Sequence, residues 1–163
     1  MRKVALLMVC VLFCSFMLNG CTKKQKLVEL LTTVETEVHT MLKELSDNCG
    51  ESDVVAINNK ITRSEELMIL VKEKMNEYDS TSEEYYMLND LYMTLEYMHS
   101  SMDAMAQLLS EPLIIITNPN LVVQIETYTS KMEESFESYI TRKINLGLET
   151  DIIDAESEYA FVG

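Results

Sequence analysis

The feature that most constrains the fold is a series of apolar residues spaced three and four positions apart through the middle of the chain. The series is Leu88, Leu91, Leu95, Met98, Met102, Met105 and Leu109. Because 3.6 residues make one helical turn, this spacing places every member on one face of an α-helix. The sequence therefore predicts a long amphipathic helix that ends before Pro112.

Two earlier segments carry the same helical pattern. A first helix is predicted from Gln25 to about Asp47. Its stripe is Leu27, Leu31, Val34, Val38, Met41 and Leu45. A second is predicted from a cap at Ser52 to about Tyr78. Its stripe is Val54, Ile57, Ile61, Met68, Val71, Met75 and Tyr78. The run LMILV at residues 67–71 predicts that the second helix is buried on more than one side.

Capping residues predict where the remaining helices begin. DSTSEE offers two overlapping capping boxes before the third helix, Ser80 with Glu83 and Thr81 with Glu84.

The fourth helix is predicted from a cap at Asn118, with Pro119 in its first turn, to about Leu146 before the stop at Gly147. The connector LIIIT before it is predicted to form a short strand or an apolar cap over one end of the domain.

These elements predict an all-α fold. Four helices joined mostly by short loops favour an antiparallel four-helix bundle, which we expect over residues 27–146, with extended coiled-coil oligomerisation as the alternative. Residues 147–163 carry five acids and no bases, so we expect an acidic tail, with one further short helix as the alternative.

The N-terminus has the layout of an exported precursor. Arg2 and Lys3 precede an uncharged apolar run, residues 4–18, that is short for a membrane-spanning helix. Leu18, Gly20 and Cys21 then resemble a lipobox, so this segment is similar to the signal peptides of bacterial lipoproteins. An ordinary secreted precursor is the alternative.

The lipoprotein resemblance implies where in the cell the protein lies and how it is attached to a membrane. Residues 1–20 would be removed as a signal peptide, and Cys21 would carry the acyl chains, palmitate among them, that hold the protein on a bilayer. Residues 21–26 would form a lipidated, basic tether whose lysines lie near the headgroups, with a merely soluble linker as the alternative. Thr22 follows the cysteine, which favours the outer membrane.

The charge of the chain limits its partners. The formal net charge is −14, and it becomes more negative when Arg2 and Lys3 are removed with the signal peptide. Nucleic acid is disfavoured because its phosphates require clustered positive charge. A basic protein partner fits the sign of the charge, as does simple solubility. The sequence does not specify an oligomeric state.

The cysteines fit an exported protein. Cys10 and Cys14 would leave with the signal peptide and Cys21 would be acylated, so Cys49 would be the remaining thiol. We interpret Cys49 as a candidate intermolecular thiol that joins a second copy or a partner in an oxidising compartment, or else as a free thiol.

Two patterns resemble metal sites. Glu96 and His99 have the Glu-x-x-His spacing of di-iron bundles, but no second copy exists, and Glu35 and His39 have a different spacing. No di-iron site is therefore predicted.

The second pattern would suit copper(I). Met98, His99, Met102 and Met105 offer soft ligands, yet the three methionines also continue the apolar stripe, so we predict core packing. No metal or cofactor is predicted.

No nucleophile motif or glycine-rich phosphate loop occurs, so no catalytic residue is predicted and the chain is not expected to be an enzyme. The expected function is that of a membrane-anchored, noncatalytic interaction module of the bacterial envelope. One narrower form is an inhibitor or immunity-type binder of a cationic partner. The alternative is a periplasmic small-molecule or copper carrier.

Overall fold

The computed structural model describes residues 23–44, 54–111 and 113–148. Within these ranges every regular element is a helix and no strand occurs, so the all-α class is confirmed. The described residues belong to two compact units. One contains residues 23–36, and the other contains the described residues from 37 to 148.

Residues 23–44 are helical throughout, so the helix already includes Lys23 and Lys24, ahead of the predicted start at Gln25. The described members of its predicted stripe are all buried: Leu27, Leu31, Val34, Val38 and Met41. Lys23, Lys24 and Lys26 are exposed within this helix. The spacing of four and three therefore identified the buried face of the first helix correctly.

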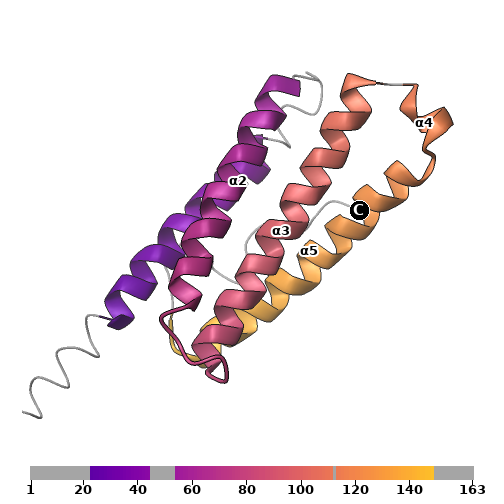
Figure 1. Ribbon diagram of the computed structural model, residues 1–163. Coiled ribbons are helices and arrows are strands. Elements are labelled where there is room, and N and C mark those ends of the chain that lie inside the picture. The colour runs from indigo at the N-terminus through magenta and orange to yellow at the C-terminus, as the bar shows by residue number, and fades with distance from the viewer. Residues whose placement is uncertain (1–22, 45–53, 112, 149–163) are drawn as a thin grey trace, which may run out of the picture. The chain divides into compact units, whose positions relative to one another are not determined.

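The second unit contains four further helices, drawn in Figure 1: α2 (Val54–Met75), α3 (Glu83–Ser110), α4 (Ile114–Thr117) and α5 (Asn120–Asn145). Helix α3 packs against both α2 and α5, and the single turn α4 contacts α3 and α5. This packing is that of a helical bundle. No helix in the described part of the chain is both long and apolar enough to cross a bilayer.

The core of this unit follows the predicted stripe of α3. Leu88, Leu91, Leu95, Met98 and Met102 are buried. Met105 and Leu109, nearer the end of the helix, are half-buried. Helix α3 has more buried residues than α2 or α5 because it packs against both of them.

Helix α2 differs from its prediction in the run LMILV. Leu67 and Val71 are fully buried, but Ile69 is 58% and Leu70 is 41% exposed. Successive residues of a helix point about 100° apart, so five consecutive apolar residues surround the axis, while only positions three or four apart share a face. The prediction that α2 is buried on more than one side of this run was wrong.

The start of α3 also differs from its prediction. Ser82 is the N-cap, and its Oγ accepts a hydrogen bond from the Tyr85 backbone N–H. Thr81 belongs to the preceding turn, where its backbone N–H and its hydroxyl both donate to Asp79 Oδ1. Both predicted capping boxes were wrong in register, because the competing turn at Asp79 moves the first helical residue to Glu83.

Helix α5 begins and ends close to the predicted residues. Pro119, not Asn118, occupies the N-cap position and provides no side-chain hydrogen bond. At the other end Gly147 has a φ of 60°, as the predicted stop requires. Its N–H donates to the Ile144 carbonyl and the N–H of Leu148 donates to that of Lys143, which together make a Schellman motif.

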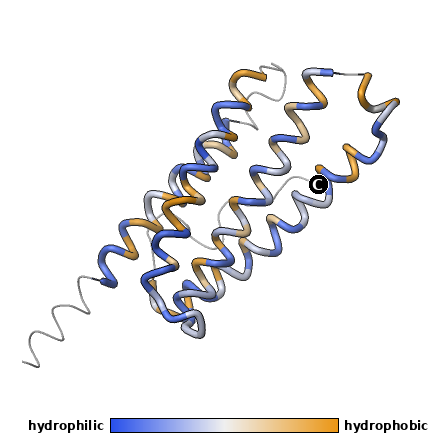
Figure 2. Tube along the Cα trace, in the orientation of Figure 1, coloured by the Kyte–Doolittle hydropathy of each residue, from blue (hydrophilic) through white to orange (hydrophobic). Residues whose placement is uncertain are grey.

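The apolar connector is helical, so the predicted strand was wrong. Residues 114–117 form α4, and Figure 2 shows hydrophobic colouring on α4 and again at the start of α5, with a hydrophilic stretch between them. Leu113 and Ile116 are exposed, so these two side chains do not cover the end of the unit as an apolar cap would.

Candidate functional site

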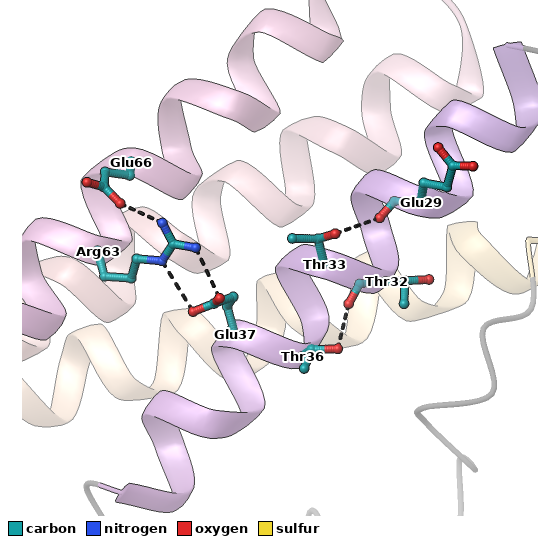
Figure 3. Close-up of polar contacts among 7 residues, drawn as sticks. All are labelled: Glu29, Thr32, Thr33, Thr36, Glu37, Arg63 and Glu66. Carbon is teal, nitrogen blue, oxygen red and sulfur yellow. Dashed lines mark hydrogen bonds and ion pairs between the residues drawn. The ribbon is translucent and has the colours of Figure 1, made fainter.

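The strongest polar contact of α2 joins it to residues 37–44. Arg63 donates from Nε to Glu37 Oε2 at 3.2 Å and from Nη2 to Oε1 at 3.0 Å, while its Nη1 donates to Glu66 at 2.6 Å (Figure 3). These hydrogen bonds hold the pKa of Glu37 below its usual value and raise the pKa of Arg63. A two-pronged pair of this kind fixes the register of neighbouring helices.

A second cluster joins α3 to α5. Arg142 donates to Asp90 Oδ2 at 2.9 Å and to Glu83 Oε2 at 2.7 Å, and Ser138 Oγ donates to the same Asp90 oxygen at 2.6 Å. The Arg142 guanidinium also lies 5.3 Å from the centre of the Tyr86 ring. Burial lowers the pKa of Arg142, but the hydrogen bonds to the two carboxylates outweigh it, so the net shift is upward.

Ion pairs within the second unit use much of its positive charge. Lys60 lies 2.7 Å from Glu44, and Lys74 lies 2.9 Å from Glu77. Together with the Arg63 and Arg142 pairs, these contacts neutralise cations inside the unit. Because acids outnumber bases 27 to 13 over the chain, the excess charge is negative.

Threonine hydroxyls on the first helix donate hydrogen bonds to backbone carbonyls of the same helix. Thr33 Oγ1 donates to the Glu29 carbonyl at 2.9 Å, and Thr36 Oγ1 donates to the Thr32 carbonyl at 2.7 Å (Figure 3). Such bonds satisfy the hydroxyl locally. They give these side chains no catalytic arrangement.

The structure brings together a serine, a histidine and an acid that the sequence did not connect. Ser64 Oγ on α2 lies 3.1 Å from His99 Nδ1 on α3, and His99 Nε2 lies 3.9 Å from Glu65 Oε1. Ser64 Oγ also donates to the Ile61 carbonyl at 2.7 Å. Ser64 is 0% exposed.

The Ser64 hydroxyl lacks the exposure that acyl transfer would need. A nucleophilic serine must reach substrate. Here the hydroxyl is fully buried and donates to a backbone carbonyl. Ser64 and His99 therefore form a hydrogen-bonded contact between α2 and α3, with Glu65 nearby.

The candidate copper ligands lie where core packing predicts. Met98 and Met102 are buried and Met105 is half-buried, whereas His99 lies at the edge facing α2. Tyr85, Tyr92 and His99, spaced seven residues apart, form a half-buried flank of α3, and Lys72 of α2 lies 5.7 Å from the Tyr92 ring centre. This flank borders the contact with α2.

The candidate di-iron residues do not gather. In the residues that the structure describes, no group of three or more histidine, cysteine, aspartate or glutamate side chains has the geometry of a metal site. Glu96 is half-buried, Glu35 is buried and His39 is exposed. Cys21 and Cys49 lie outside the described residues.

A charge pattern that sequence reasoning missed is the absence of bases from the middle of the chain. No lysine or arginine lies between Lys74 and Lys131, whereas acidic residues continue through this stretch. The signal is present in the sequence itself. Its meaning depends on which of the acids and apolar residues are exposed.

No known protein family, no curated protein and no solved structure matches this chain.

Proposed function

We propose that the chain is a lipid-anchored protein of the bacterial envelope whose helical domain binds a cationic protein without catalysing a reaction. The observation that carries the proposal is the arrangement of charge. Lys60, Arg63, Lys74 and Arg142 are paired with acids within the second unit, while other acids are exposed. The exposed acids include Glu73, Asp103, Glu126, Glu134 and Glu137. A surface of this kind steers and orients a basic partner.

An inhibitor or immunity-type binder is the narrower form of this function. Such a protein blocks a cationic partner by covering it, which requires exposed charge and a rigid scaffold but no reactive group. The burial of Ser64 supports a noncatalytic role, because its hydroxyl is not exposed to a substrate.

The anchor is proposed from the N-terminal residues. Residues 1–20 would be cleaved, Cys21 would be acylated, and the outer membrane is the favoured location. Cys21 lies two residues before Lys23, the first described residue, which is already helical. The exposed lysines of this helix would therefore lie close to the lipid headgroups.

The scaffold is proposed to be an antiparallel bundle. Contacts between α2 and α3 support this arrangement, since Ser64 contacts His99 and, further along α2, Lys72 contacts the earlier residue Tyr92. The same inverse order relates α3 to α5 through Ser101 with Thr129 and Asp90 with Ser138.

Chemical crosslinking in intact cells, followed by purification of the full-length anchored protein, tests the function. The expected result is a crosslinked envelope protein with a basic surface whose capture weakens as salt rises. Glu134→Gln combined with Glu137→Gln should reduce capture, because both carboxylates are exposed.

The matched control for this experiment leaves the charge unchanged. Thr127→Ala combined with Thr141→Ala alters exposed residues of the same helix, and capture should persist. An acidic partner, or capture that is independent of salt and of both carboxylates, would contradict the proposed function.

A further inference from the structure

One end of the second unit exposes four large apolar side chains. They are Leu113, Ile116, Val122 and Val123, and they are 75%, 78%, 40% and 57% exposed. We call these four residues the tip patch. Figure 2 shows hydrophobic colouring over α4 and the first turn of α5, the two short neighbouring segments that carry them.

The tip patch is built on a defined backbone. Within α4 and its ends, Ile116 N–H donates to the Leu113 carbonyl at 3.0 Å and Asn118 N–H donates to the Ile114 carbonyl at 2.6 Å. Next in the chain, Leu121 is buried and attaches the start of α5 to the core. The four exposed side chains therefore project from α4 and the start of α5, whose backbone is held by these hydrogen bonds and by buried Leu121.

The charges nearest to the tip patch in the chain are negative. Glu111 is exposed at the C-cap of α3, and Glu126 is exposed one helical turn after Val122. The patch lies within the part of the chain that has no lysine or arginine, between Lys74 and Lys131. An apolar surface bordered by one sign of charge selects a partner with the opposite sign.

We propose that the tip patch is the docking site for an amphipathic segment of a partner protein that presents apolar side chains flanked by lysine or arginine. This inference rests on the proposed function and locates its contact. The apolar side chains of the partner would cover the four patch residues, and its cations would face Glu111 and Glu126. Laying the apolar face of a helix on such a surface is a common form of peptide recognition.

The sign of the charge disfavours a second copy as the occupant. Two tip patches placed face to face would bring like charges together, because each patch is bordered by Glu111 and Glu126. A bilayer surface is disfavoured because anionic lipids would bring further negative charge to Glu111 and Glu126. Both occupants are distinguished from a basic peptide by the experiments below.

The first experiment measures peptide affinity with the full-length protein held in phosphatidylcholine nanodiscs. The probe is a fluorescent synthetic helix with leucine on one face and lysine on its flanks, read by anisotropy and compared with empty nanodiscs. Ile116→Ser combined with Val123→Ser should weaken binding by about tenfold. Ile69→Ser combined with Ile144→Ser, which changes two exposed isoleucines elsewhere, should leave it unchanged.

Changes to the probe separate the two components of recognition. A probe with glutamate in place of lysine should not bind, and one with serine in place of leucine should bind weakly and lose its dependence on the patch. The proposal is overturned if the leucine–lysine probe fails to bind, if the glutamate probe binds equally well, or if the control variant weakens binding as much as the patch variant.

The second experiment uses the absence of tryptophan from the chain. The emission of Val123→Trp should shift to shorter wavelength when the leucine–lysine probe is added, while that of Ile69→Trp should not. Quenching of Val123→Trp by brominated lipid without peptide would assign the patch to the membrane and overturn the proposal. A dimer that Ile116→Ser dissociates would assign it to a second copy, with the same consequence.

The outcomes also separate this inference from the proposed function. If crosslinking captures a cationic partner equally well with and without the patch substitutions, the function stands and the tip patch is not the contact. If the peptide binds the patch but no cationic partner is captured in cells, the surface is confirmed and the proposed function fails.

Discussion

Arg142 on α5 donates from Nε to Oδ2 of Asp90 on α3 across 2.9 Å. The same oxygen accepts a hydrogen bond from Ser138, so one carboxylate holds two donors of the neighbouring helix. Asp90→Ala removes both bonds and should lower the free energy of unfolding by about 1 to 2 kcal/mol, allowing for partial exposure of the pair. Denaturant unfolding of the full-length protein measures the loss.

Two variants control for the loss at Asp90. Asp90→Asn keeps an acceptor oxygen and should cost less than Asp90→Ala. Glu126→Ala removes an exposed carboxylate and should change stability little. An equal decrease in the free energy of unfolding in all three variants would show that the hydrogen bonds of Asp90 do not stabilise the contact between α3 and α5.

Glu37 should make stability depend on pH in the acid range. Hydrogen bonds from Arg63 lower the pKa of Glu37 in the folded protein below the ordinary value of 4.5. Its stabilising contribution is therefore present above pH 4.5 and is lost as the pH falls through the lower folded pKa.

The prediction compares the native chain with Glu37→Gln by thermal unfolding across pH. The native chain should unfold at a higher temperature at neutral pH, and the difference should shrink below pH 4.5. Glu134→Gln provides a control at an exposed carboxylate of α5. A difference that stays constant into strong acid would contradict the ion pair as its source.

Ser64 should be inert as a nucleophile and important as a helix contact. A fluorophosphonate probe should not label it in the folded protein, because the hydroxyl is buried and donates to the Ile61 carbonyl. Ser64→Ala should lower the free energy of unfolding by about 1 kcal/mol through the lost contact with His99. Stoichiometric labelling that is absent in Ser64→Ala would instead identify an active serine.

The apolar spacing predicted which residues of the first helix and of α3 are buried. Leu31 and Leu95 are fully buried, as predicted from their place in a stripe of residues spaced three and four apart. The helical repeat alone decides which residues share a face. Spacing does not say how many neighbours a helix has. Ile69 therefore looked buried in the sequence but is exposed on α2.

The polar contacts could not be predicted in the same way. Ser64 and His99 lie 35 positions apart, so their contact depends on the alignment of α2 along α3. Likewise Ser82 and Thr81 are both suitable helix caps, and the choice depends on the turn formed by Asp79. The exposure of the tip patch could not be predicted either, since the run LIIIT has the composition of a buried strand.

Cys21 should carry the membrane anchor. Labelled palmitate should enter the native chain and not Cys21→Ser, because Cys21 is the cysteine that follows the lipobox-like residues Leu18 and Gly20. Inhibiting the lipoprotein signal peptidase should leave a precursor longer by about the signal peptide. Cys49→Ser is the control and should label normally; equal labelling of Cys21→Ser would refute the anchor.

The methionines of α3 should behave as core residues and not as copper ligands. Met98 and Met102 are buried, so replacing either with leucine should cost less than about 1.5 kcal/mol, whereas alanine should cost about 2 to 5 kcal/mol. Met105 is half-buried, so Met105→Ala should cost less than Met98→Ala. Chemical denaturation of the full-length variants measures each loss.

Copper(I) titration with a competing chelator completes the test. If the thioethers only fill the core, the native chain and the triple leucine variant should compete equally poorly for the metal. Ligation predicts a different pattern, since the triple leucine variant would stay folded yet lose the metal, and His99→Ala would also weaken binding. Tight binding that requires both His99 and the methionines would overturn the core assignment, because the thioethers of Met98 and Met102 are buried and could reach copper(I) only if the core around α3 opened.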